Sequence, residues 1–96
     1  MSAFIIATVT VRDVEKFTEY GKRAGASMAP FGGEVLQRGK LNSVFAGEAD
    51  HVVAAVIRFP DQQSLAAWHA SPEYQAIIPL RDEAADITLI SYDGLT

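Results

Sequence analysis

The chain of 96 residues contains no cysteine, which excludes a disulfide, a thiolate nucleophile and a thiolate metal ligand. It also lacks the P-loop, G-x-G-x-x-G, H-E-x-x-H and G-x-S-x-G motifs, each of which marks a particular chemistry. The two histidines, His51 and His69, are separated in the chain and belong to no recognised metal-ligand motif. We therefore expect neither a metal ion nor an organic cofactor.

Long apolar runs are missing as well. The run from Phe4 to Val9 is far shorter than the roughly 20 residues that a membrane-spanning helix needs. Residues Met1 to Ala3 lack the basic region that begins a signal peptide. These absences predict a cytoplasmic protein with no membrane-spanning segment.

Positive charge is scarce. Eight lysine and arginine residues stand against twelve aspartate and glutamate residues, giving a formal net charge of −4. The basic residues are spread along the chain instead of forming a cluster. Because a nucleic-acid backbone attracts clustered positive charge, we expect neither nucleic acid nor an anionic membrane as a partner.

Four stretches are typical of β-strands, at residues 3–11, 34–40, 52–59 and 87–92. The first and third carry apolar side chains on both faces, whereas the second is more polar and is predicted at an edge of the sheet. The segment between the second and third strands, residues 41–51, is predicted to be a loop that turns at Gly47.

Two helical regions separate these strands. Asp13 and Asp61 are predicted to cap their first turns. The first helix shows an apolar stripe at three- and four-residue spacing, formed by Val14, Phe17, Gly21, Ala24 and Met28. The second region restarts at Ser71-Pro72-Glu73, where a hydroxyl cap, a proline and a carboxylate begin a helix. Pro79 is predicted to break or re-angle that helix.

The order β-α-β-β-α-β predicts an α+β ferredoxin-like fold with a four-stranded antiparallel sheet, in a single domain over residues 1–96. Helices can cover only one face of such a sheet. The other face carries more apolar surface than a monomer usually exposes. Burying ~600 Å² of it per subunit would contribute about 15 kcal/mol before entropic costs. We therefore predict a homodimer through the open sheet face.

Several motifs together resemble a known family. They are Pro30-Phe31-Gly32-Gly33, Phe59-Pro60, Trp68, Ser71-Pro72-Glu73-Tyr74-Gln75 and Arg81. This pattern resembles domain of unknown function 1330, a family of small bacterial proteins within the dimeric α/β-barrel superfamily. The resemblance implies a ferredoxin-like dimer with a cleft between sheet and helices, and it implies no particular reaction.

Candidate site residues fall into two groups. Tyr20 and His69 are candidates for proton transfer, because a tyrosine on the first helix can reach the cleft and an imidazole titrates near neutral pH. The alternative for His69 is a solvated position on the helix surface.

Four further residues are candidates for substrate binding. Trp68 and Tyr74 are amphipathic rings suited to a pocket for an aromatic ligand, although both can equally serve as core packing. Arg38 is predicted on one strand face with Leu36 and Glu34, where its guanidinium would hold an anion. Arg81 would bind a ligand or form a surface ion pair with Asp82 or Glu83.

Three functions are open at this point. The first is a cofactor-independent enzyme that acts on a small carboxylated or aromatic metabolite. The second is a non-catalytic dimer that binds a small molecule or serves a stress response. The third, more distant, is a haem-handling protein that uses His69.

Overall fold

The computed structural model describes residues 2–95. The elements in chain order are β1 (Ala3–Val11), α1 (Val14–Met28), the 3₁₀ turn η1 (Ala29–Phe31), β2 (Glu34–Lys40), β3 (Val53–Phe59), α2 (Gln62–Ala70), α3 (Pro72–Gln75), α4 (Ile78–Ala84) and β4 (Ala85–Asp93). The strands form one antiparallel sheet in the order β2-β3-β1-β4. This is the predicted ferredoxin-like fold.

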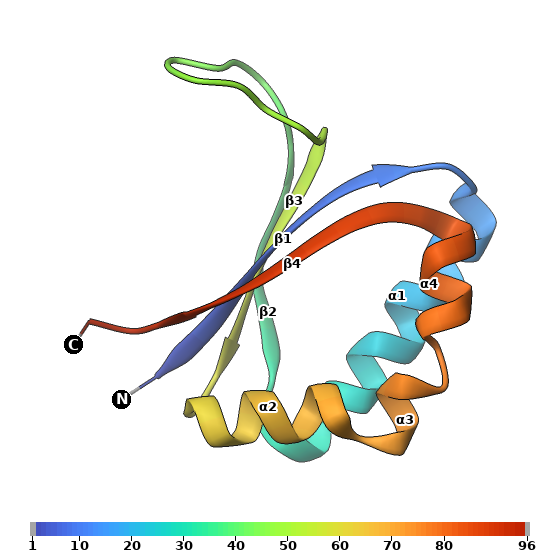
Figure 1. Ribbon diagram of the computed structural model, residues 1–96, viewed down its shortest axis with the longest axis vertical. Coiled ribbons are helices and arrows are strands. Elements are labelled where there is room, and N and C mark those ends of the chain that lie inside the picture. Colours follow the sequence, from blue (N-terminus) through green and yellow to red (C-terminus); the bar gives the residue numbers. More distant parts are fainter. Residues whose placement is uncertain (1, 96) are drawn as a thin grey trace.

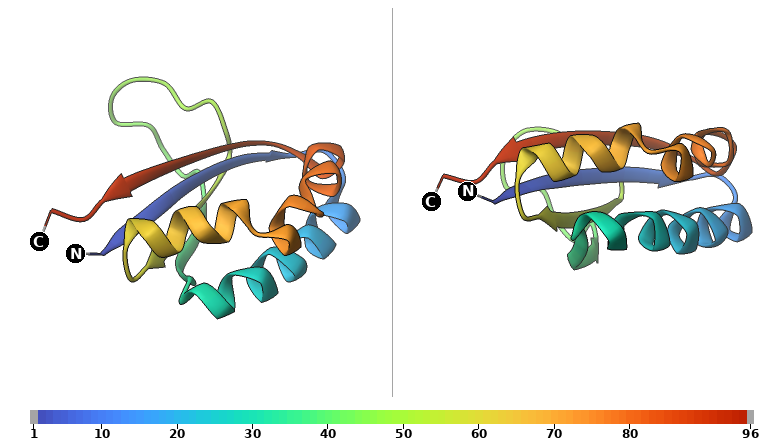
Figure 2. Two further views of the ribbon diagram at one scale, coloured as in Figure 1. Left: turned by 60° about the horizontal axis from the view of Figure 1, so that its bottom comes forward. Right: turned by 90° about the horizontal axis from the view of Figure 1, so that it is seen from below.

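All helices lie on one face of the sheet, and the opposite face carries none (Figures 1 and 2). The strands therefore form one layer and the helices a second. Within residues 2–95, no helix has the length and apolar character that crossing a membrane requires.

The central positions of β1 and β3 confirm the prediction drawn from their two apolar faces. Side chains of β1 alternate, and Ala3, Ile5, Ala7 and Val9 are buried beneath the helices. Their neighbours, including Ile6, point to the open face and are half-buried. The more polar β2 is an edge strand, as predicted.

The core stripe of α1 differs from the predicted one. Val14 is 73% exposed, whereas Tyr20, Ala24, Ser27 and Met28 are buried. The reason lies before the helix, where the backbone N–H of Asp13 donates to the Ala84 carbonyl at 3.0 Å. This bond holds the start of α1 at the end of α4, where Val14 projects into solvent.

The predicted helix caps are present. The carboxylates of Asp13 and Asp61 accept hydrogen bonds from the third backbone N–H of their helices, at 3.0 and 2.7 Å. Hydrogen bonding from Ser64 lowers the pKa of the Asp61 carboxyl. Ser71 caps α3 by accepting from the Tyr74 N–H at 3.2 Å. Pro79 lies in the first turn of α4, so it re-angles the chain as predicted.

Candidate functional site

A cavity of about 440 Å³ lies between α1 and the sheet. This volume falls within the range of small-molecule sites. Most of its wall is apolar and comes from α1 and all four strands, with Trp68 from α2 at one side. Phe17, Ala24 and Met28 face it from α1, while Ile57 and Leu89 face it from the sheet. A ligand here would contact mainly hydrocarbon.

Two cationic residues, Lys22 on α1 and Arg38 on β2, are among those that line the cavity. Neither forms an ion pair within residues 2–95, whereas Lys16, Arg23, Arg58 and Arg81 all do. No aspartate, glutamate or histidine of the described residues lines the cavity. Among the described residues, the charged side chains of the wall are therefore all positive.

The position of Arg38 corrects one prediction. Its register partner is Ala55, and that of Val35 is Ile57, so both residues share the helix-covered face. Glu34 pairs with Arg58 on the opposite face. The reason is a bulge between Val35 and Gln37, which inserts one extra residue and moves later side chains to the other face.

Tyr20, Tyr74 and Arg81 form a hydrogen-bonded chain. The Tyr20 and Tyr74 hydroxyl oxygens are 2.9 Å apart, and Arg81 Nη1 donates to the Tyr74 hydroxyl at 3.2 Å. Both tyrosines are buried, and Arg81 is half-buried with its Nε donating to Asp82 at 3.1 Å. The sequence predicts that Tyr20 can reach the cleft, and in the structure its hydroxyl lies in the interior against Tyr74.

Arg81 donates to the Tyr74 hydroxyl, and either hydroxyl can be the donor between Tyr74 and Tyr20. One hydroxyl hydrogen makes this contact, and the hydrogen bonds of residues 2–95 give the other no acceptor. When Tyr74 is the donor, the hydrogen left over belongs to Tyr20, a residue that lines the cavity.

Burial is the main cause that raises the pKa of the Tyr20 hydroxyl far above its ordinary value. Tyr20 is therefore neutral at physiological pH. For Arg81, burial would lower the pKa, but the contacts with Tyr74 and Asp82 outweigh this and raise it. The chain thus places a permanent positive charge behind a neutral donor.

Trp68 serves both packing and the cavity wall. Its ring is 1% exposed and lies 4.4 Å from the Tyr74 ring centroid and 5.4 Å from that of Phe59. Its indole N–H donates to the Ser27 hydroxyl at 2.9 Å, and Ser27 donates in turn to the Ala24 carbonyl. The buried polar atoms on this side of the cavity are therefore satisfied.

The predicted site residues divide into two sets. Tyr20, Arg38 and Trp68 line the cavity. Tyr74 and Arg81 do not line the cavity. They are linked to it by hydrogen bonds, from Arg81 to Tyr74 and between Tyr74 and Tyr20. His69 is exposed and packs its ring against Trp68 and Tyr74, outside the cavity lining. Within residues 2–95, no group of three acidic, histidine or cysteine side chains is placed to hold a metal ion.

Sequence reasoning missed Lys22. Lys22 follows Tyr20 by two residues and lies on the exposed side of an amphipathic helix. Such a lysine normally indicates only a solvated surface. No signal in the sequence distinguishes it from Lys16 or Arg23, because only the folded chain places Lys22 in the cavity wall.

Comparison with protein families gives one match. The model of the family described as domain of unknown function (DUF1330) matches residues 2–95. No curated protein sequence matches the chain.

Several solved structures share this fold. A protein of unknown function from Rhodopseudomonas palustris is 19% identical, with a TM-score of 0.82, and the match covers 99% of this chain and 83% of that one. A dimeric ferredoxin-like protein of unknown function from Jannaschia sp. is 10% identical, with a TM-score of 0.76 and coverage of 98% and 100%. SnoaB, a cofactor-independent oxygenase from Streptomyces nogalater, is 12% identical, with a TM-score of 0.71 and coverage of 99% and 94%. At these identities the likeness establishes the fold alone.

Proposed function

The chain belongs to the family of domain of unknown function 1330, and on this premise we propose that it is a homodimer whose subunits each bind a compact, largely apolar carboxylate. The cavity beneath α1 is the binding site. One observation supports this most directly: Lys22 and Arg38, two cations that form no ion pair within residues 2–95, line a largely apolar cavity. An anionic group on the ligand would neutralise them, and its hydrocarbon part would fill the rest.

Tyr20 adds a second polar contact. In the proposed site Tyr74 donates to Tyr20, so the Tyr20 hydrogen is left for the ligand. Because burial raises its pKa, Tyr20 acts as a neutral donor and not as a base. The positive charge of Arg81, transmitted through Tyr74, strengthens that donor. A carbonyl, phenol or enolate oxygen on the ligand is the matching acceptor. An aromatic or cyclic keto acid combines both features.

We propose that the two subunits pack against each other through the open faces of their sheets. The large apolar side chains on this face are those of Phe4, Ile6, Val56, Ile90 and Tyr92. Ile90 is 47% exposed, and the rings of Phe4 and Tyr92 stack at 5.3 Å on the same surface. A second copy of this face would remove them from water. Proteins of the same fold, such as the one from Jannaschia sp., are described as dimeric.

Calorimetric titration with 2-naphthoate tests the binding site. The wild type is expected to bind 2-naphthoate and to bind the neutral 2-naphthamide at least about tenfold more weakly, which is a difference of ~1.4 kcal/mol. Arg38→Ala and Lys22→Ala should each remove most of that preference. Arg23→Ala is the matched control, since Arg23 lies on the same helix, pairs with Glu19 and is outside the cavity. Equal binding of the acid and the amide would contradict the anion site.

A second candidate function is cofactor-independent catalysis at the same site. It is favoured by the fold shared with SnoaB and by the neutral donor at Tyr20. In this candidate Tyr20 stabilises the oxyanion of an enolised ligand, Arg38 holds its carboxylate, and a water molecule accepts the carbon-bound proton.

Deuterium exchange separates the two candidates. With an enolisable cyclic keto acid in D₂O, a catalyst would replace the hydrogen on the carbon next to the carbonyl by deuterium. NMR spectroscopy would measure the rate of this exchange. Tyr20→Phe should slow this exchange about a hundredfold, as for loss of one oxyanion donor. His69→Ala should leave the rate unchanged, because His69 lies outside the cavity lining. Binding without exchange above the solvent rate would leave the non-catalytic function alone.

A further inference from the structure

Residues 41–52, here called the arm, join β2 to β3. At the base of the arm the Leu41 N–H donates to the Val52 carbonyl at 2.6 Å, and the Val52 N–H donates to the Val9 carbonyl at 3.3 Å. From there the arm projects away from the helices and curls to the side of the sheet that carries none (Figures 1 and 2). It is the part of the described chain that stands off from the two layers.

The arm exposes apolar side chains. Phe45 is 98% exposed, and Val44 and Leu41 are 48% and 45% exposed. Within residues 2–95, no backbone group of residues 42–51 forms a backbone hydrogen bond. A phenylalanine left wholly in water loses the free energy that its burial would provide, roughly 1.5–3 kcal/mol. The arm therefore has an unsatisfied apolar tip.

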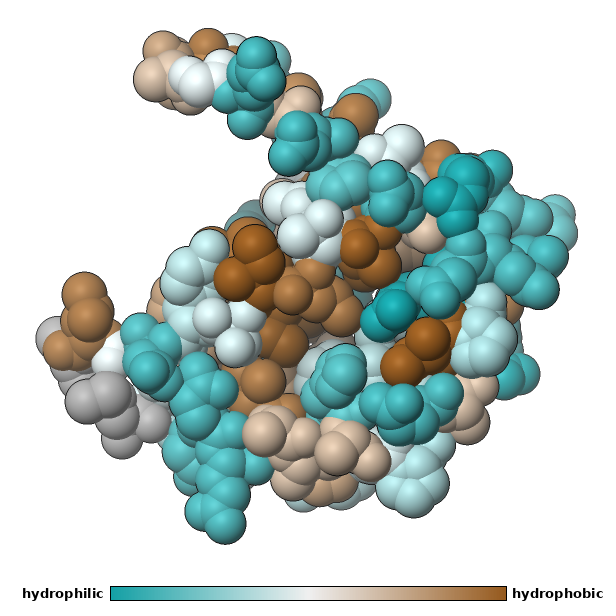
Figure 3. Space-filling view, in the orientation of Figure 1, coloured by the Kyte–Doolittle hydropathy of each residue, from teal (hydrophilic) through white to brown (hydrophobic). Residues whose placement is uncertain are grey.

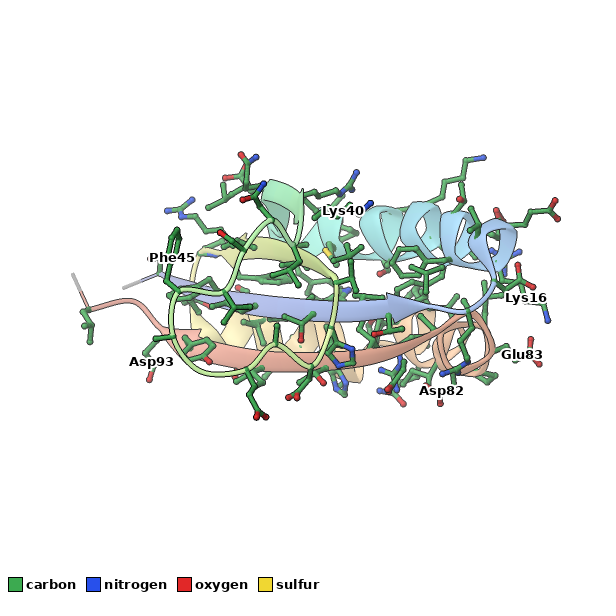
Figure 4. The ribbon with its side chains drawn as sticks, turned by 90° about the horizontal axis from the view of Figure 1, so that it is seen from above. Lys16, Lys40, Phe45, Asp82, Glu83 and Asp93 are labelled. Atoms are coloured by element: carbon green, nitrogen blue, oxygen red, sulfur yellow. The ribbon has the colours of Figure 1, made fainter. Side chains whose placement is uncertain are left out.

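The arm is nevertheless fixed to the open sheet face at its base. His51 Nδ1 lies 2.8 Å from the Thr10 hydroxyl, and His51 Nε2 lies 3.1 Å from the Thr88 hydroxyl. Thr10 and Thr88 belong to β1 and β4 and point to the open face. In the space-filling view the arm stands clear of the body, with hydrophobic side chains on the body below it (Figure 3). Phe45 lies at the opposite end of the molecule from Lys16 and Glu83 (Figure 4).

We propose that the arm of each chain packs against a second copy of this chain, with Phe45 as its apolar anchor. This inference rests on the proposed homodimer through the open sheet face. Two sheets stacked face to face are about 10 Å apart. The five residues from Leu41 to Phe45 can span up to ~17 Å. The arm is thus long enough to pass the edge of the partner's sheet and to place Phe45 against the partner.

Twofold symmetry then makes the contact reciprocal, because an isologous interface uses the same surface on both copies. Each chain would hold the other with its arm while the two sheet faces meet. The arm adds the side chains of Leu41, Val44 and Phe45 to an interface that otherwise consists of one sheet face. Stable interfaces bury about 1,200–2,000 Å² in total. The side chains of the arm would add to the area that the sheet face buries.

Sedimentation equilibrium of Phe45→Ser tests the anchor. The dimer dissociation constant is expected to rise at least about tenfold relative to the wild type, as for loss of a buried aromatic anchor. Val14→Ser is the control, since Val14 is also strongly exposed but lies at the start of α1. Because neither side chain contributes to the core, far-ultraviolet circular dichroism should be unchanged in both variants.

Thiol protection provides a second measurement, which a chain without cysteine makes clean. In Ser43→Cys, which leaves Phe45 in place, maleimide labelling should be about tenfold slower at concentrations that favour the dimer than after dilution. Val14→Cys should label at one rate throughout. A wild-type dimer with unchanged affinity in Phe45→Ser and an unprotected Cys at position 43 would overturn the arm contact alone. A wild type that stays monomeric would overturn the proposed dimer and the arm contact together.

Discussion

The two faces of the sheet carry similar side chains in different surroundings. On β1, Ile5 is 3% exposed beneath the helices, whereas its neighbour Ile6 is only half-buried on the open face beside Ile90. Both residues belong to one apolar strand. The difference shows that an apolar pattern identifies surfaces that need cover but does not say what covers them. Helices from the same chain cover one face and leave a cavity, and we propose that a second chain covers the other.

The largest expected effect is on the helix-covered face. Trp68→Ala should lower the free energy of unfolding by about 3–5 kcal/mol, since it removes a ring that packs against Phe59 and Tyr74. Urea denaturation at a fixed protein concentration would measure this loss. Leu95→Ala, at a side chain that is 96% exposed, should change stability by less than about 0.5 kcal/mol. Similar losses in both variants would contradict the packing described for Trp68.

The next largest effect belongs to the open face. Ile90→Glu should raise the dimer dissociation constant at least about a hundredfold, because it places a charge in an apolar contact. The monomer should remain folded, since Ile90 is outside the helix-covered core. Val14→Glu is the control, because it places the same charge at an exposed position away from that face. Gel filtration across a dilution series would distinguish the variants, and equal dissociation constants for both would exclude this face as the interface.

A smaller effect is expected inside the hydrogen-bonded chain. Tyr74→Phe should destabilise the protein by about 1–2 kcal/mol, because it removes the hydroxyl between Arg81 and Tyr20 and leaves Tyr20 without its partner. Tyr92→Phe is the control, because the Tyr92 hydroxyl forms no hydrogen bond within residues 2–95. If both variants shifted the midpoint of thermal unfolding equally, the hydrogen bonds among Arg81, Tyr74 and Tyr20 would contribute nothing to stability.

The smallest effect near neutral pH concerns Tyr20. Its pKa is raised in the folded protein, so the folded state keeps a proton that the unfolded state releases above pH ~10. The corresponding stability is fully present below pH ~10 and is lost as the pH rises above it. Denaturation between about pH 8 and 11 should show a steeper alkaline decline in the wild type than in Tyr20→Phe. Parallel curves would mean that Tyr20 ionises in the folded protein as readily as in the unfolded chain.

Much of the fold follows from local chemistry in the sequence. Asp13, Asp61 and Ser71 have hydroxyl or carboxylate side chains one residue before a helix, so their caps are predictable. The apolar character of β1 and β3 on both faces likewise predicts their central places. These features depend on residues that are near one another in the chain.

The site depends on distant residues and is less predictable. Arg38 reaches the cavity only because a bulge in β2 changes its face, and no glycine or proline between Val35 and Gln37 signals that bulge. The Tyr20–Tyr74 contact joins residues 54 positions apart through helix packing. Each side chain was individually a candidate, but their order, with Arg81 behind Tyr74 and Tyr74 behind Tyr20, requires the folded structure.

Sedimentation equilibrium of the wild-type chain from about 1 to 100 µM tests the central claim most directly, because stable dimers commonly dissociate in or below this range. If the open face is covered by a second copy, the measured mass should approach that of two chains as the concentration rises. The Ile90→Glu variant should keep the mass of one chain under the same conditions. A wild type with the mass of a single chain at every concentration would contradict the account, since the apolar open face and the arm would then have no partner.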